Sequence, residues 1–121
     1  MREGFTYFAS SRFVQREVVL EALRCCAKRL RAECPSVMAV YLFGSFATGT
    51  ATPRSDADIL VEIAEEDSSL REAIQGQAIS IFAEAPVPAE VFVKSSRELE
   101  EGRRTGRGIA GAVAREGLRL A

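Results

Sequence analysis

The chain has 121 residues, of which 47% are hydrophobic and 27% are charged, and its formal net charge is -1. This profile is typical of one globular domain with enough chain for a core, and it leaves little room for two domains. No apolar run is long enough to span a membrane, and the first residues lack the features of a secretory signal, so we expect a cytoplasmic protein with a single domain over residues 1–121.

The first half of the chain predicts a helix followed by two strands. Apolar residues recur at helical spacing from Val14 to Arg31, which predicts an amphipathic helix over about residues 12–33 that ends before Pro35. The apolar run Val37–Phe43 is rich in branched and aromatic residues and predicts a buried strand. A loop with several Gly, Pro, Ser and Thr residues leads to a second strand, Ser55–Ile63.

The second half predicts a helix, a strand and another helix. Ser69 lies three residues before a glutamate, a capping-box spacing that opens a helix running to about residue 85. The segment 88–95 reads as a third strand, and Ser95 with Glu98 forms a second capping box. The order helix, strand, strand, helix, strand, helix, followed by a tail, favours the α/β (α+β) class.

The types of residue present narrow the chemistry. There is no histidine, which removes the commonest general base and every Ser-His or Cys-His nucleophile. The three cysteines form no C-x-x-C pair, and we interpret them as free thiols. Any catalysis must therefore depend on carboxylates, lysines, arginines and bound metal.

Charge is unevenly distributed along the chain. Residues 37–96 hold three basic and nine acidic side chains, whereas residues 1–36 hold seven and four and residues 97–121 hold six and four. An acidic centre suits cation binding, and basic flanks suit phosphates or an acidic partner, although such runs are more often solvated faces.

Two carboxylates interrupt the second predicted strand. Asp56 and Asp58 project from the same face of a strand, and their apolar neighbours project from the other. Such a pair repels itself unless a cation lies between, and hard oxygen ligands suit Mg²⁺ or Mn²⁺. Glu90 enters the third strand and would complete a site for two metal ions if that strand pairs with the second. The alternatives are that the aspartates are turn and strand-edge residues and that Glu90 faces solvent.

The loop before Asp56 suits phosphate binding. Gly44 follows a strand and lets the backbone approach a ligand closely, and Ser45 offers hydroxyl and amide donors. Ser45 lies eleven positions before Asp56, so a donor-lined turn and a carboxylate pair could face each other across one triphosphate.

Together these residues resemble a known signature. The stretch "LFGSFATGTATPRSDADILVEI", with an acid on a later strand, is similar to the G-S, spacer, D-x-D pattern of the nucleotidyltransferase superfamily related to DNA polymerase beta, and most similar to its minimal nucleotidyltransferase (MNT) domains. The ending on Glu116 and Gly117 is also similar, and the likeness covers most of a core at about residues 37–121. The residues that carry it are Gly44, Ser45, Gly49, Ser55, Asp56, Asp58 and Glu90.

The resemblance implies a mixed sheet flanked by helices. It also implies Mg²⁺, as two ions with Mn²⁺ as a substitute, held by Asp56, Asp58 and Glu90. The substrate would be ATP or another NTP, with its phosphates bound at Gly44, Ser45 and Ser55. Many minimal members are antitoxins paired with a HEPN toxin, to which they transfer AMP.

The chain departs from the family pattern at two positions. Thr48 stands where many members have an arginine, a phosphate contact that Arg54 would have to replace. Glu90 stands where the third acid is often aspartate, which keeps the charge but lengthens the side chain.

A second glycine motif points elsewhere. "GRGIAG", Gly106–Gly111, spells the G-x-G-x-x-G dinucleotide pattern, but no predicted strand precedes it and no ribose-binding acid follows. We interpret these glycines as loosening a short helix, allowing close packing or marking a mobile segment. The nearby Arg103, Arg104 and Arg107 read as a solvated basic face, with contact to a partner or nucleotide as the alternative.

Three functions therefore remain open. The leading one is transfer of a nucleoside monophosphate to a hydroxyl of a HEPN-like partner. The second is a binding module that neutralises such a partner by contact, and the third is transfer to a small molecule such as an aminoglycoside, for which the chain offers little surface. Nothing in the sequence indicates direct nucleic-acid or membrane binding, and homo-oligomer formation is left open.

Overall fold

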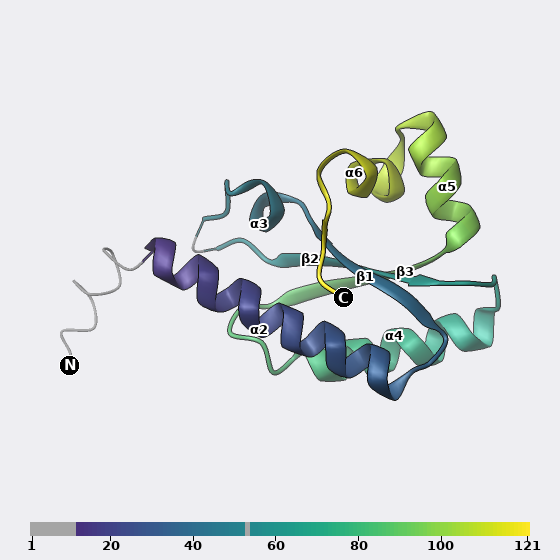
Figure 1. The fold of residues 1–121 in the computed structure, drawn as a ribbon, viewed down its shortest axis with the longest axis horizontal. Coiled ribbons are helices and arrows are strands. Elements are labelled where there is room, and N and C mark those ends of the chain that lie inside the picture. The colour runs from purple at the N-terminus through teal and green to yellow at the C-terminus, as the bar shows by residue number, and fades with distance from the viewer. Residues whose placement is uncertain (1–11, 53) are drawn as a thin grey trace.

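The computed structural model describes residues 12–52 and 54–121, which form four helices, one single helical turn and four strands. In chain order they are α2 (Arg12–Glu33), β1 (Val37–Phe43), α3 (Ser45–Thr48), β2 (Ala57–Ile63), α4 (Ser68–Phe82), β3 (Ala89–Ser95), α5 (Ser96–Thr105), α6 (Gly108–Glu116) and β4 (Leu118–Arg119) (Figure 1). None of the described helices combines the length and apolar character needed to cross a membrane.

The strands form one mixed sheet in the order β3-β2-β1-β4. β1 is antiparallel to β2 and β4, while β2 and β3 are parallel and connected through α4. The expected mixed sheet with flanking helices is thus confirmed. The short strand β4 was not predicted, because it lies in what the sequence presents as a tail.

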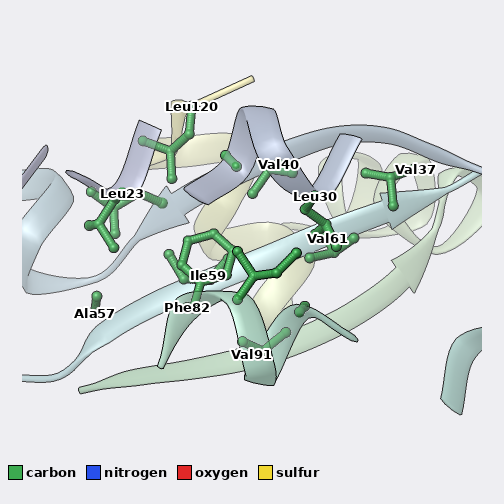
Figure 2. Packing of buried hydrophobic residues seen from close by; sticks show 14 of the residues in the cluster. Leu23, Leu30, Val37, Val40, Ala57, Ile59, Val61, Phe82, Val91 and Leu120 are labelled. Atoms are coloured by element: carbon green, nitrogen blue, oxygen red, sulfur yellow. The ribbon is translucent and has the colours of Figure 1, made fainter. Parts of the chain in front are cut away.

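Helices cover both faces of the sheet (Figure 1). On one face, Ile59 and Val61 of β2 are fully buried against side chains of α2 and α4 such as Leu23 and Phe82 (Figure 2). On the other face, Leu60 is fully buried in a smaller cluster with Val113 of α6. Burying a side chain such as Leu60 stabilises the fold by about 1.5–3 kcal/mol. Asp58 and Leu60 project from the same face of β2, and α5 and α6 cover this face at Leu60.

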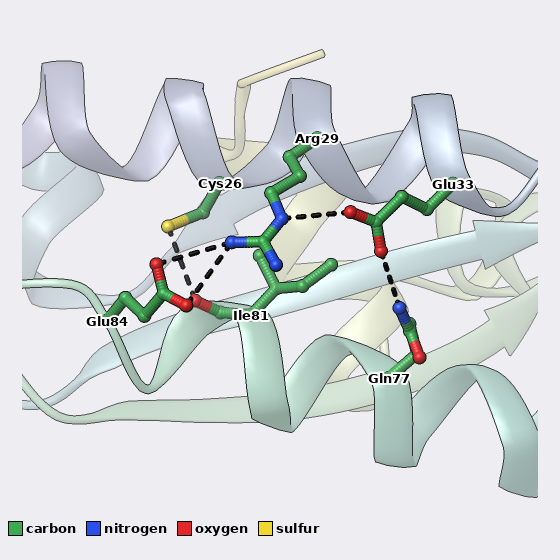
Figure 3. Close-up of polar contacts among 6 residues, drawn as sticks. All are labelled: Cys26, Arg29, Glu33, Gln77, Ile81 and Glu84. Atoms are coloured by element: carbon green, nitrogen blue, oxygen red, sulfur yellow. Dashed lines mark hydrogen bonds and ion pairs between the residues drawn. The ribbon is translucent and has the colours of Figure 1, made fainter.

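Polar side chains brace α2 against α4 (Figure 3). The guanidinium of Arg29 pairs with Glu33 at 2.9 Å and with Glu84 at 3.2 Å. Gln77 of α4 donates to Glu33 at 2.6 Å. All four side chains are exposed, where solvent screens the attraction between charges, so these contacts orient the helices while the core supplies the stability.

The two predicted capping boxes had different outcomes. Ser95 accepts from the backbone N–H of Glu98, whose side chain accepts from the backbone N–H of Ser95, which confirms the second box. The first was wrong: α4 begins earlier, with Asp67 as N-cap accepting from the N–H of Leu70. Asp67 is itself a strong cap residue, so it outcompetes Ser69 for the helix start. α4 also ends at Phe82, three residues before the predicted end.

Side chains from α4 occupy the outer edge of β3. Arg71 donates to the carbonyl oxygen of Val93 at 2.8 Å, and Gln75 donates to that of Val91 at 3.2 Å. Arg71 also pairs with Glu98 of α5 at 2.9 Å. One arginine therefore connects a helix, the edge strand and the following helix.

The G-x-G-x-x-G segment forms the turn between α5 and α6. Gly106 caps α5 in the left-handed conformation, with φ 72°, and its carbonyl accepts from Arg115 at 2.7 Å. A Cβ at Gly111 would overlap the backbone of Gly106, and one at Gly102 would overlap Ala110. The close-packing interpretation is confirmed, because a side chain at Gly102 or Gly111 would keep α5 and α6 apart. The segment also follows a helix, whereas the dinucleotide pattern follows a strand.

Candidate active site

The strand register brings two of the predicted acids together. Asp58 is the partner of Glu90 across the parallel β2–β3 pair and of Phe43 across the antiparallel β1–β2 pair. Adjacent strands lie about 4.8 Å apart, and paired residues project from the same face. Asp58 is half-buried and Glu90 is exposed, so the pair is open to a ligand from solvent.

Asp56 lies just outside the strand that was predicted to contain it. β2 begins at Ala57, whose N–H donates to the carbonyl oxygen of Pro88 at 2.8 Å, and Asp56 is exposed in the preceding turn. The prediction that Asp56 and Asp58 project from the same face of one strand is therefore wrong, because Asp56 precedes the strand. Its position near the site is set by the turn.

The electrostatics of Asp58 show that the two other carboxylates act on it. Burial raises the pKa of Asp58 above its usual range, and the negative charges of Glu90 and Asp56 raise it further. An ionised carboxylate in that position is unfavourable until a cation offsets it. The three acids therefore suit a cation.

The described residues do not form a ready-made metal cage. Among residues 12–52 and 54–121, no three acidic or thiol side chains are grouped closely enough to hold a metal ion. Mg²⁺ does not require such a cage, because it binds through one or two carboxylates and completes its shell with water and substrate phosphates. Asp58 and Glu90, paired at a solvent-open edge, fit that mode of binding.

Gly44 links the glycine turn directly to Asp58. Its backbone has φ 77° and ψ -154°, a region that is essentially restricted to glycine. A Cβ at this position would overlap Oδ2 of Asp58. Glycine is therefore required both by the backbone and by the close approach of the carboxylate.

The turn after Gly44 is a single helical turn rather than the predicted loop. α3 is anchored by Phe46, which is buried in the same core cluster as Val19 of α2. The carbonyl oxygen of Ser45 accepts from the N–H groups of Gly49 and Thr50 at 3.0 and 2.9 Å. The first N–H groups of such a turn have no acceptor within it. Gly44, which precedes the turn, is the residue that the carboxylate of Asp58 approaches.

The hydroxyl of Thr48 forms its hydrogen bonds within the turn. Its hydroxyl lies 3.4 Å from the carbonyl oxygens of both Gly44 and Ser45 and 2.9 Å from the hydroxyl of Thr50. The side chain at this position therefore stabilises the local backbone.

The remaining predicted site residues shape the loop before β2. Ser55 Oγ accepts from the N–H of Thr52 at 2.8 Å, so the hydroxyl holds the turn that leads to Asp56. Arg54 is exposed, and its backbone N–H donates to the Thr52 hydroxyl at 3.3 Å. Arg54 thus lies near the acids in the chain, with its side chain at the surface.

Sequence reasoning missed one residue that contacts the glycine turn. Arg16 of α2 donates through Nη2 to the carbonyl oxygens of Phe46 at 2.9 Å and Ala47 at 3.4 Å. In the sequence it is one of several arginines on an amphipathic helix, and no motif distinguishes it from Arg24. Only the fold shows the contact.

Comparison with known proteins gives a family match over most of the chain. The family described as the nucleotidyltransferase domain matches residues 23–103, which include the glycine turn and all three acids. No curated protein matches the chain significantly.

Solved structures share the fold. A protein from Sulfolobus solfataricus assigned as a nucleotidyltransferase is 17% identical, with a TM-score of 0.61 over 88% of this chain and 83% of that one. A chain of a toxin-antitoxin complex with AMP-PNP is 23% identical, with a TM-score of 0.53 over 81% of this chain and 72% of that one. A complex of the tri-AMPylated Shewanella oneidensis HEPN toxin with an MNT antitoxin also matches, at 17% identity and a TM-score of 0.47, over 88% and 71%.

Proposed function

Because the chain belongs to the nucleotidyltransferase domain family, we propose that it is a magnesium-dependent enzyme that transfers a nucleoside monophosphate, AMP in the first instance, from a nucleoside triphosphate to a hydroxyl group of a partner protein. The observation that carries this proposal is the pairing of Asp58 with Glu90 next to Gly44, where a carboxylate pair and a glycine turn meet.

In this proposal the acids hold the metal. Asp56, Asp58 and Glu90 would bind two Mg²⁺ ions, with Mn²⁺ as a substitute, and the raised pKa of Asp58 supports a site that is completed by cations. When bound, Mg²⁺ supplies positive charge against the phosphate oxygens. The greater length of Glu90 would be accommodated because its side chain is exposed.

The glycine turn would bind the phosphates. Gly44 and Ser45 directly follow Phe43, the register partner of Asp58, so their amide groups and the hydroxyl of Ser45 would supply donors for phosphate oxygens at this end of the sheet. Arg54, exposed on the next loop, can approach a phosphate by rotation of its side chain, while Ser55 holds that loop.

The transfer itself needs a base and a bound acceptor. The oxygen of the acceptor hydroxyl attacks the α-phosphorus, a new P–O ester bond forms, and the bond from the α-phosphorus to the bridging oxygen breaks. Pyrophosphate leaves with that electron pair, and the hydroxyl proton passes to a carboxylate, for which the exposed Glu90 is placed best. The chain has no histidine that could take this role.

We propose a HEPN-type toxin as the acceptor. The resemblance to minimal nucleotidyltransferases supports this choice, and one structure of the same fold is a toxin-antitoxin complex with AMP-PNP. The chain would then act as an antitoxin that modifies its partner.

The test is incubation of the purified chain with ATP and Mg²⁺, alone and with the product of the neighbouring gene, followed by intact mass measurement of both proteins. We expect the partner to gain the mass of an AMP group, and Asp56→Asn with Asp58→Asn to abolish the gain. Glu65→Gln, which removes an exposed acid from the loop after β2, is the matched control and should leave the gain unchanged. A stable complex without mass gain, with any nucleoside triphosphate and with either Mg²⁺ or Mn²⁺, would contradict transfer and favour the binding module.

A further inference from the structure

The contact between Arg16 and α3 connects the first described helix to the glycine turn. The N-terminal part of α2 passes close to α3 (Figure 1), and the guanidinium of Arg16 reaches the carbonyl oxygens of Phe46 and Ala47 at 2.9 and 3.4 Å. These residues follow Ser45 directly. Arg16 thus holds the last part of the turn whose first part carries Gly44.

A turn of this length needs outside support. α3 has four residues, and an isolated helix of that size does not persist in water. Phe46 anchors it from the core side. The last carbonyl groups of a helix receive no hydrogen bond from a donor within it, and a guanidinium placed there donates to them and complements the helix dipole.

The environment of Arg16 does not favour a role in stability alone. Its Nε is buried and has no hydrogen-bond partner among the described residues. A buried donor without a partner costs free energy that an apolar side chain of similar length would avoid. What an apolar side chain cannot do is hold the two carbonyl groups.

We propose that Arg16 is a positioning residue for triphosphate binding: it fixes the end of α3 so that the amide groups at Gly44 and Ser45 keep the orientation that the phosphates require. This inference rests on the proposed function. Arg16 itself acts from behind the turn, through backbone carbonyl groups, and makes no contact with Asp58 or Glu90 among the hydrogen bonds and ion pairs of the described residues.

The experiment compares Arg16→Met and Arg16→Lys with Arg24→Met. Arg24 lies on the same helix and pairs with Glu21 alone among the described ion pairs, so it is the matched control. Amide hydrogen exchange, followed by NMR, reports on the N–H groups of Gly49 and Thr50, which donate to Ser45. Calorimetric titration with ATP and Mg²⁺ gives the dissociation constant.

We expect Arg16→Met to speed exchange of these two amides about tenfold, while the amides of β2 stay unchanged, and to raise the dissociation constant for ATP about tenfold, which corresponds to about 1.4 kcal/mol. Arg16→Lys, which keeps one donor, should show smaller effects, and it carries the test if Arg16→Met does not fold. Arg24→Met should show neither effect.

Four outcomes would overturn the inference. Unchanged exchange at Gly49 and Thr50 in the Arg16 variants would show that the contact does not hold the turn. Faster exchange throughout the chain, or faster local exchange with unchanged ATP affinity, would show a purely structural role. If exchange changes as expected but the unaltered chain binds no nucleoside triphosphate with Mg²⁺ or Mn²⁺, the proposed function itself fails, and the positioning role fails with it.

Discussion

Replacing Gly44 with alanine tests the direct contact between the glycine turn and Asp58. The backbone angles, φ 77° and ψ -154°, fall in a region that costs a residue other than glycine about 1–3 kcal/mol. The new Cβ would also overlap Oδ2 of Asp58. Overpacking costs about 1–3 kcal/mol, and the lower value applies here because the end of a short side chain can rotate away. Gly44→Ala should therefore lower the free energy of unfolding by about 2–4 kcal/mol.

Urea denaturation of four variants separates the two contributions. Gly49→Ala, at φ 84° with no other atom within 4 Å of its Cβ, provides a control with backbone strain alone. In an Asp58→Ala background the overlap is absent, so Gly44→Ala should cost about 1 kcal/mol less there than in the unaltered chain. Equal costs in the two backgrounds would refute the contact. A cost for Gly44→Ala no greater than that of Gly49→Ala would refute the whole argument.

Two further predictions concern pH. Burial raises the pKa of Asp58, and the charges of Glu90 and Asp56 raise it further, so the folded state binds the proton of this carboxyl more tightly than the unfolded state. The resulting stabilisation is present at low pH and is lost as the pH rises through the raised pKa. Asp58→Asn should therefore raise the melting temperature by a few degrees at pH 7 without divalent ions, with less gain at acid pH, and a lower melting temperature at pH 7 would contradict this. Burial raises the pKa of Glu98, but hydrogen bonds from Ser95 and Arg71 outweigh it and lower the pKa overall, so its stabilisation is present at neutral pH and lost as the pH falls through the lowered value. Glu98→Gln should cost about 1 kcal/mol at pH 7 in urea denaturation and less at low pH, and a cost independent of pH would show that its charge is not involved.

The strand β1 was predictable because burial on both faces of the sheet leaves a nearly continuous apolar run in the sequence. Val37–Phe43 matches β1 at both ends, since an apolar run bounded by Pro35 and Gly44 has few other solutions. The helix predicted over about residues 12–33 is also confirmed as α2. Both predictions depend on patterns that lie within one segment of the chain.

What the sequence did not reveal depends on contacts between distant segments. β4 has two residues and forms only because Leu118 and Arg119 reach Tyr41 and Leu42, far away in the chain. The pairing of Asp58 with Glu90 could be stated only as a condition, because it depends on which strands lie side by side, and β2 and β3 are separated in the chain by α4.

The candidate site also has a part that could be predicted from local sequence and a part that could not. The glycine turn and the two aspartates could be identified by their spacing in the sequence, and the resemblance supplied their roles, which remain predictions. Arg16 was invisible because its partners are backbone carbonyl groups, which leave no trace in the sequence around Phe46. The place of Asp56 outside β2 was missed because a strand end is decided by backbone pairing rather than by side-chain type.

The occupied edge of β3 affects how this protein can meet others. Free carbonyl groups on an edge strand are where a foreign strand adds to a sheet, in aggregation and in some peptide complexes. Here Arg71 and Gln75 already bind the carbonyl groups of Val93 and Val91, so an added strand would first have to displace both side chains and break the ion pair with Glu98. The β3 edge is thereby protected from strand addition, and a partner at that edge would have to dock on side chains.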